Sequence, residues 1–256
     1  MNYLYCHYVE GPREEYLRIG VPLYEASIRC DWKEAKAILD EHPELVRCSI
    51  TENGETPLHI AASVKINSKQ VEQFVKKLVD MMTKDDLELQ NQNHNTAFYL
   101  AASGGNIKTV MFMLEKNRIL ARIPGANGMM MPLYAAAMFK NYEVVKYLYE
   151  NSHDLRDDGW TTENRGWLVE KCVEGDMFDV ALRIVKIYPQ LGSGRVLTLL
   201  ALKPEAFSET NSNKIKRNIN SGKHELMMIV PLQVTKYVFN CFTDITKYDV
   251  YKFQEI

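Results

Sequence analysis

The sequence of 256 residues contains few cysteines, and they follow no recognisable pattern. No CxxC pair occurs, and no cysteine lies at zinc-binding spacing from a histidine. Because disulfide frameworks use a different pattern, reduced thiols in a reducing compartment are expected. The five cysteines are Cys6, Cys30, Cys48, Cys172 and Cys241.

A long hydrophobic run is also missing. The longest apolar stretch near the C-terminal end, residues 226–234, is interrupted by Pro231 and Gln233. A membrane-spanning helix needs about 20 apolar residues. The first ten residues lack the basic segment and apolar core of a signal peptide. For the chain as given, we therefore expect a cytoplasmic location.

Neither sign of charge dominates, since the formal net charge is −2 at pH 7. This balance gives no reason to expect nucleic acid as a partner. Phosphate-binding loops, EF-hand calcium loops and catalytic triads are missing as well. We predict no catalytic residue, no cofactor and no metal site.

What the sequence does contain is one motif repeated at nearly constant spacing. Its clearest copy, TPLHIAA at residues 56–62, is close to the ankyrin signature T-P-L-H-x-A. The other copies are VPLYEA at 21–26, TAFYLAA at 96–102, MPLYAAA at 131–137, the weaker GWLVEKC at 166–172 and the half-match LTLLA at 197–201. Their leading apolar residues are 35, 40, 35, 35 and 29 positions apart, near the ankyrin period of about 33: Leu23, Leu58, Phe98, Leu133, Leu168 and Leu197.

Each position of the motif suits a helix that packs against its neighbours. Thr56 can cap the helix, and Pro57 fits its first turn. The paired alanines leave only small side chains on one face of the helix, so that neighbouring repeats can approach closely. His59, replaced by tyrosine in other copies, can hydrogen-bond to the turn of the next repeat. The alternative role of catalytic base is not needed to explain it.

Turns and second helices complete each unit. Breaks at 30–31, 105–106, 140–141 and 175–176 predict turns between antiparallel helices. Amphipathic patterns predict second helices over 32–39, 107–114, 142–149 and 178–185, with a longer one over 68–82. Segments rich in Asn and Gly at 52–54, 91–94 and 127–128 predict projecting turns, or fingers. The predicted fold is an all-α ankyrin-repeat solenoid of antiparallel helix pairs with β-turn fingers.

The predicted organisation has three parts. An N-terminal segment, residues 1–19, precedes an array at 20–207 of five to six units, the last ones degenerate. Residues 208–256 form a linker and tail with an amphipathic stretch. This stretch could cap the end of the array, or dock on a partner or a membrane surface. The units are expected near 20–54, 55–94, 95–130, 131–165 and 166–193, with a half unit at 194–207.

Several stretches are similar to one particular family. The chain resembles the plant ankyrin-repeat proteins that carry a C-terminal membrane domain known as the PGG domain. The resemblance covers roughly residues 15–207 and depends on EYLR at 15–18, MPLYAAA at 131–137, FDVAL at 178–182 and LALKPEAF at 200–207. It implies a membrane-anchored stress or defence signalling adaptor whose repeats face the cytosol. The PGG segment is not in this sequence, so a soluble relative and a truncated gene model both remain open.

The function predicted from these features is a non-enzymatic protein–protein interaction adaptor. Its partners are expected to be other proteins, with a membrane involved only if a further C-terminal domain exists. The alternatives are a ligand-sensing or catalytic protein with its site in the tail, or a fragment without independent activity. The predicted partner-binding residues lie on fingers and at helix ends: Glu52, Asn53, Ser63, Val64, Gln92, Asn93, Ser103, Asn127, Met129, Met138 and Phe139. Among them, the run from Met129 to Met131 with Met138 and Phe139 is the most apolar, and packing against the adjacent finger is the alternative role.

Overall fold

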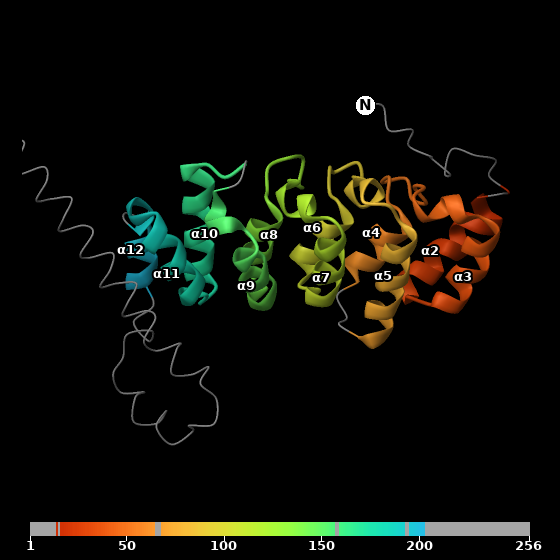
Figure 1. The fold of residues 1–256 in the computed structure, drawn as a ribbon, viewed down its shortest axis with the longest axis horizontal. Helices are drawn as coiled ribbons and strands as arrows, with labels where there is room; N and C mark the ends of the chain where they lie inside the picture. The colour runs from red at the N-terminus through yellow and green to blue at the C-terminus, as the bar shows by residue number, and fades with distance from the viewer. Residues whose placement is uncertain (1–13, 15, 65–67, 157–158, 193–194, 203–256) are drawn as a thin grey trace, which may run out of the picture. The chain divides into compact units, whose positions relative to one another are not determined.

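The computed structural model describes residues 14, 16–64, 68–156, 159–192 and 195–202. The predicted tail at 208–256 and most of the N-terminal segment lie outside these residues. Within the described ranges the chain is helical, without β-strands, and the order of its helices follows the predicted pairing (Figure 1). The chain divides into two compact units, residues 1–148 and 149–256.

The α-helices agree with the predicted boundaries within a few residues for most units. Short 3-10 helices follow most of the second helices of each pair and lead into the next loop. The α-helices are α2 (Val21–Arg29), α3 (Trp32–Glu41), α4 (Pro57–Ser63), α5 (Lys69–Met81), α6 (Ala97–Gly104), α7 (Ile107–Lys116), α8 (Pro132–Met138), α9 (Tyr142–Glu150), α10 (Thr162–Glu174), α11 (Phe178–Ile187) and α12 (Arg195–Ala201). The remaining helical segments are η2 (Tyr16–Gly20), η3 (Pro43–Val46), η4 (Asp85–Glu88), η5 (Arg118–Arg122), η6 (His153–Leu155) and η7 (Pro189–Gly192).

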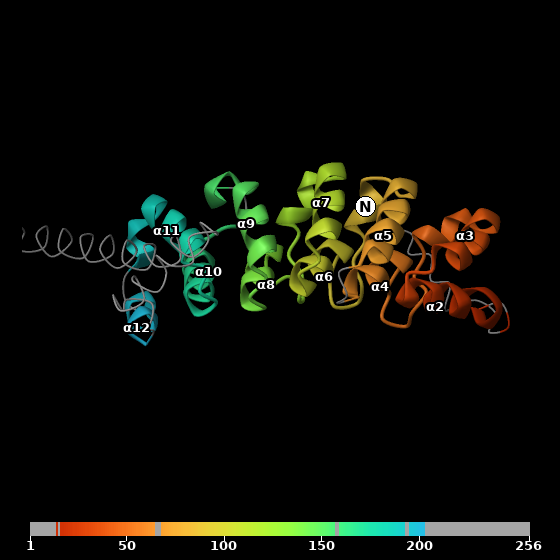
Figure 2. The ribbon, with the colours of Figure 1, turned by 90° about the horizontal axis from the view of Figure 1, so that it is seen from below.

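The first unit is a stack of helix pairs. Helices α2, α4, α6 and α8 contact one another in sequence, and we call them the inner helices. Figure 2 shows α3, α5 and α7, the outer helices, in a second row beside them. Helix α2 joins α3 and helix α6 joins α7 through a short turn, which confirms these predicted helix pairs.

The core of this unit comes from the repeated motif. Its leading residues Leu23, Leu58, Phe98 and Leu133 are all buried at equivalent places on the inner helices. The small residues behind them are buried too, and Ala61, Ala101 and Ala136 are fully inaccessible. Because alanine has almost no side chain, adjacent inner helices pack closely and bury the larger side chains between the two rows.

Side-chain caps fix where the helices begin. The Thr56 hydroxyl accepts a hydrogen bond from the main-chain nitrogen of His59, and Thr96 caps α6 in the same way. Asp31 caps α3, and Ser68 caps the long helix α5. Each cap satisfies a main-chain N–H that has no partner within its helix, which is worth about 1 kcal/mol. Where the motif has threonine before its first helical residue, as in α4 and α6, it therefore encodes the start of the helix directly.

The second unit departs from the predicted pattern at two positions. Helix α10 begins at Thr162, before the motif copy at 166–172, because a capping box of Thr161 and Asn164 starts the helix early. Leu168 is therefore in its second turn, although it is buried like the other leading residues. In α12 the expected leading residue Leu197 is only half-buried. Val196 and Leu200, four residues apart on one helix face, are buried instead.

The loop before α10 is held by contacts of one cationic and one aromatic side chain. The guanidinium of Arg165 lies 4.6 Å from the centre of the Tyr188 ring and donates two hydrogen bonds to the main-chain oxygen of Leu155, at 2.8 and 3.1 Å. The hydroxyl of Tyr188 donates to the main-chain oxygen of Asp154 at 2.9 Å. These contacts stabilise residues 153–155, whose φ angles are all positive.

Candidate protein-binding surface

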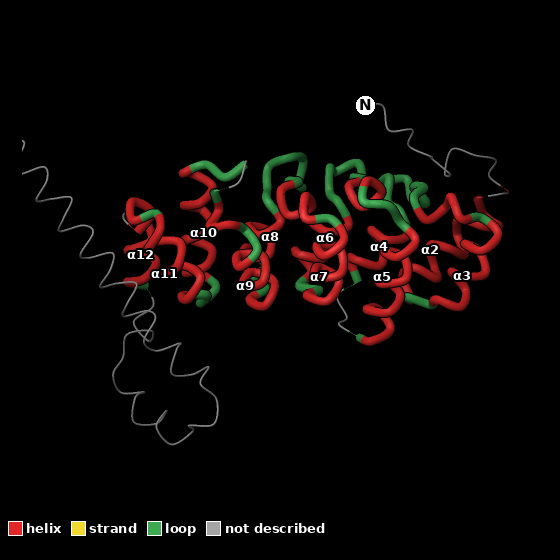
Figure 3. The backbone as a smooth tube through the Cα atoms, viewed as in Figure 1, coloured by secondary structure: helices red, strands yellow, loops and turns green. Residues whose placement is uncertain are grey.

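Three loops of the first unit project on one side of its inner helices (Figure 3). We call them finger 1 (residues 50–55), finger 2 (residues 90–96) and finger 3 (residues 125–130). Each closes with main-chain hydrogen bonds, such as Ile50 N to Glu55 O at 2.8 Å and Gly125 N to Met130 O at 2.9 Å. Left-handed residues form the tips, among them Asn127 and Gly128 in finger 3. These are the fingers that the sequence predicted.

The fingers are joined to one another by hydrogen bonds. The main-chain nitrogen of Gln92 donates to Asn53 O at 2.9 Å, and its side-chain nitrogen donates to Glu52 O at 2.6 Å. The main-chain nitrogen of Asn127 donates to Asn93 O at 2.9 Å. Neighbouring fingers therefore form one continuous row, and some of their polar groups are used in the hydrogen bonds between them.

His59 connects an inner helix to the next finger. Its Nδ1 atom lies 2.8 Å from the Thr56 hydroxyl, and its Nε2 atom donates to the main-chain oxygen of Asn95 at 3.1 Å. The ring is buried, and burial lowers the pKa of His59 to about 4 because the charged imidazolium loses its hydration. A neutral ring with its proton on Nε2 satisfies both partners. The geometry confirms the bridging role and explains the residue without catalysis.

Tyr99 occupies the same motif position in the next repeat. Its hydroxyl donates to the sulfur of Met130 in finger 3 at 3.7 Å. Its ring lies directly against Gly125, where an added Cβ atom would be 2.5 Å from the tyrosine Cγ. Finger 3 can approach the tyrosine this closely only because residue 125 has no side chain.

Asparagine side chains at the turns between helices bind the preceding repeat. The amide nitrogen of Asn106 donates to the main-chain oxygens of Ala62 and Val64, at 3.0 and 2.8 Å. Asn141 makes the same pair of bonds to Ala102 and Ser103, at 3.1 and 2.8 Å. These bonds satisfy carbonyls at the ends of α4 and α6 that have no partner within their helices. The sequence pattern predicted both asparagines only as turn residues, although their spacing of 35 positions matches the repeat.

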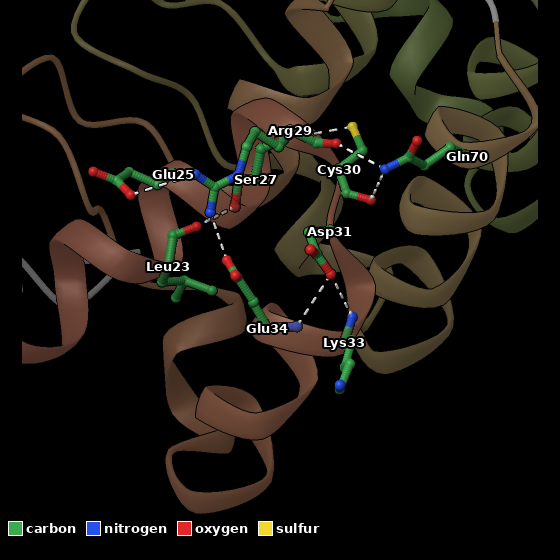
Figure 4. A network of polar contacts seen from close by, with 9 residues as sticks. All are labelled: Leu23, Glu25, Ser27, Arg29, Cys30, Asp31, Lys33, Glu34 and Gln70. Atoms are coloured by element: carbon green, nitrogen blue, oxygen red, sulfur yellow. Dashed lines mark hydrogen bonds and ion pairs between the residues drawn. The ribbon is translucent and has the colours of Figure 1, made fainter.

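In the first repeat a glutamine takes this role (Figure 4). Gln70, on α5, donates through its amide nitrogen to the main-chain oxygens of Arg29 and Cys30, at 3.0 and 3.3 Å. The side chain of Arg29 is held by Glu34 at 2.6 Å and by Glu25 at 3.6 Å. The end of α2 is thereby fixed, and the cation of Arg29 is already paired.

The predicted polar site residues lie on the fingers and at helix ends. Glu52, Gln92, Asn93 and Asn127 are exposed, whereas Asn53 is half-buried. The hydroxyls of Ser63 and Ser103 turn back to carbonyls of their own helices, Ile60 O at 2.8 Å and Leu100 O at 3.0 Å. Val64 is half-buried and ends α4. These residues therefore lie on the fingers and helix ends of successive repeats. The helix ends of α4 and α6 carry only small side chains, Ser63, Val64 and Ser103.

The predicted apolar site residues are exposed where finger 3 leads into α8 and where α8 ends. The exposed fraction is 70% for Met129, 58% for Phe139 and 42% for Met138. The prediction that the whole run from Met129 to Met131 offers an apolar surface is wrong. Met131 is buried because it precedes the first turn of α8, and Met130 is half-buried under the Tyr99 hydroxyl.

The parts of the chain that the structure describes offer little for other chemistry. No group of three or more His, Cys, Asp and Glu side chains in these parts could hold a metal ion. No helix in them has the length and hydrophobicity needed to cross a membrane. Cys30, Cys48 and Cys172 form no disulfide and are buried, and burial raises the pKa of Cys30 to about 11. Such thiols are poor nucleophiles.

Comparison with known proteins agrees with this geometry. Residues 64–158 match the family model for ankyrin repeats, in three copies. No curated protein matches the chain. Together with the stacked helix pairs and fingers, the match confirms the predicted fold, an all-α ankyrin solenoid. Ankyrin repeats support a role in protein–protein interaction.

Proposed function

We propose that this protein is a non-enzymatic adaptor that binds another protein through its first unit. The binding surface comprises the tips of the three fingers and the exposed ends of the inner helices. The ankyrin repeats at residues 64–158 support this class of function. Since solenoids present extended surfaces rather than closed pockets, a protein segment is a more suitable partner than a small molecule.

One observation carries the proposal, the exposure of Met129, Met138 and Phe139. These side chains are large and apolar. Stacking of the repeat does not require a large side chain at the position of Met138, since two of the three preceding copies have serine there, Ser63 and Ser103, and the first has Ile28. Burying one such side chain against a partner contributes about 1.5–3 kcal/mol. Methionine also adapts its shape to different partners.

A finer proposal concerns the pathway. The resemblance to plant ankyrin-repeat proteins of the PGG family supports a role in stress or defence signalling, with the repeats on the cytosolic side. The identity of the partners recovered from the native cell tests this part separately.

Proximity labelling in the native cell, with the full chain as bait, tests the binding surface. Wild type is compared with the double variant Met138→Glu, Phe139→Glu. Carboxylates at these positions should abolish labelling of direct partners, because an apolar interface would have to bury unpaired charge. Circular dichroism should give the same melting temperature for both chains, since both side chains are exposed.

A matched control is Ile119→Glu on η5. Ile119 is 57% exposed, but it belongs to the segment after the outer helix α7 and not to a finger or an inner helix. This variant should label the same partners as wild type. Equal labelling by wild type and by the double variant, with both chains folded, would refute the proposed surface.

A further inference from the structure

The proposed surface changes in character from its first to its last repeat. Finger 1 carries Glu52 and Glu55, and neither forms an ion pair with any residue that the structure describes. Glu52 is exposed, whereas the carboxylate of Glu55 accepts hydrogen bonds from Thr51 Oγ1 and Asn53 Nδ2 within the finger, at 3.2 Å each. The cation of Arg29, at the end of the first inner helix, is held by Glu25 and Glu34 (Figure 4). This end of the surface is therefore anionic.

The other end is apolar, with a cation at its border. Finger 3 and the end of α8 expose Met129, Met138 and Phe139, and the next residue, Lys140, is exposed as well. Between the two ends, the middle repeat contributes finger 2, which has no Asp, Glu, Lys or Arg, and the short side chain of Ser103. The middle offers no continuous apolar stripe of the kind that an amphipathic helix needs.

The distance between the ends follows from how the fingers are joined. Each finger consists of two extended chain segments, which in fingers 2 and 3 form an isolated antiparallel bridge. Paired extended segments lie about 4.8 Å apart, so one finger step is about 10 Å. Packed helices have nearly the same spacing, about 8–10 Å. Fingers 1 and 3 are two steps apart, which gives about 20 Å across the repeats. Met138 and Phe139 lie at the end of α8 that is farther from finger 3, about 10 Å along the helix. The direct distance from finger 1 is therefore about 22 Å, and an extended segment, which advances about 3.3 Å per residue, covers it with about seven residues.

Resting on the proposed function, we infer that the partner segment is an extended peptide with a basic side chain about seven residues from a large apolar one. The basic side chain binds at the exposed Glu52, where Glu55 adds to the negative charge, and the apolar one binds at Met138 and Phe139. Lys140 repels a basic group at the apolar end and so fixes the direction of the peptide. This inference depends on complementary charge and on the spacing of the repeats.

Selection from a displayed library of random twelve-residue peptides, with the full chain as bait, tests the inference. The selected peptides should share an Arg or Lys about six to eight positions from a Leu, Met, Phe or Trp. One of them is then synthesised with a fluorescent label, and its affinity is measured by anisotropy. If no peptide is enriched, or if the enriched peptides lack this pair, the inference is overturned.

Two variants separate the inference from the function on which it rests. Glu52→Gln with Glu55→Gln should weaken peptide binding about threefold to fivefold at low salt, and roughly 0.5 M NaCl should remove the difference from wild type. Met138→Glu with Phe139→Glu should weaken it about tenfold or more. The control Glu41→Gln, with Ile119→Glu, should leave the affinity unchanged.

The combinations of outcomes are distinct. Loss of binding only in the Met138 and Phe139 variant, with no effect of salt or of the Glu52 and Glu55 variant, overturns the inference and leaves the adaptor function intact. If neither variant affects binding, both the inference and the proposed surface fail.

Discussion

The Nε2 atom of His59 donates a hydrogen bond to the main-chain oxygen of Asn95, 36 positions later, at 3.1 Å. The same oxygen accepts a hydrogen bond from Asn91 N inside finger 2, at 3.0 Å. The side-chain oxygen of Asn95 accepts another from Ala126 N in finger 3, at 2.6 Å. One asparagine thus connects an inner helix to two fingers, and the spacing of the fingers depends on it.

Removing the His59 ring should destabilise the first unit. In the variant His59→Ala, the free energy of unfolding should fall by about 2–3 kcal/mol, because a buried ring is lost and Asn95 O loses a donor. Urea denaturation followed by circular dichroism measures the change. The control His94→Asn, at an exposed left-handed position that asparagine tolerates, should stay within about 0.5 kcal/mol of wild type. Equal urea midpoints for His59→Ala and wild type would contradict this role.

The same histidine should make stability depend on pH. Its pKa is about 4 in the folded chain, below the usual value of 6.5, so the unfolded chain binds the proton more readily between these values. The stability that neutral His59 provides is complete above pH 6.5 and is lost as the pH falls towards 4. From about pH 7.5 to about pH 5 this amounts to about 2 kcal/mol.

Urea denaturation of wild type and His59→Gln at both pH values isolates this effect, because glutamine does not titrate. Wild type should lose about 2 kcal/mol more than the variant on going to about pH 5. Parallel losses in both chains would show that His59 is not the group responsible.

Gly125 should tolerate no side chain. A Cβ atom there would lie 2.5 Å from Cγ of Tyr99 and 2.7 Å from Oδ1 of Asn95. The ring is rigid at Cγ, and Oδ1 is held by a hydrogen bond from Ala126 N at 2.6 Å. Gly125→Ala is expected to cost about 1–3 kcal/mol through this overpacking. Gly104→Ala, at the end of α6 with no neighbour closer than 3.8 Å, should be neutral or stabilising by up to about 1 kcal/mol. Thermal melts of the two variants should shift in opposite directions or differ clearly in size.

Asn106 should matter through its amide nitrogen. Asn106→Asp keeps the shape but replaces the donor by a carboxylate that faces the main-chain oxygens of Ala62 and Val64. A loss of about 2–3 kcal/mol is expected, since two carbonyls lose their donor and a buried charge is created. Asn127→Asp, whose side chain is exposed at a finger tip, provides the control and should change stability by less than about 0.5 kcal/mol. Similar urea midpoints for the two variants would argue against the Asn106 contact.

The repeat, the helix pairs and the starts of most helices in the first unit could be predicted from the sequence because these features are local. Thr56 caps the helix that follows it, Pro57 fits the first turn, and the alanine pair lies at helical spacing. The signal weakened in the second unit, where Thr161 and Asn164 start α10 early. In α12, Val196 and Leu200 replace Leu197 in the core.

Only the tertiary structure shows the hydrogen bonds from one repeat to the next. It also shows which of the predicted surface residues are exposed. Asn106 and Asn141 find their acceptors on the preceding repeat, and Gln92 contributes to the row of fingers. Met131 is buried although Met129, two positions before it, is exposed. The bonds between repeats depend on groups that stacking brings together from about 35 positions away, which a local sequence pattern does not show.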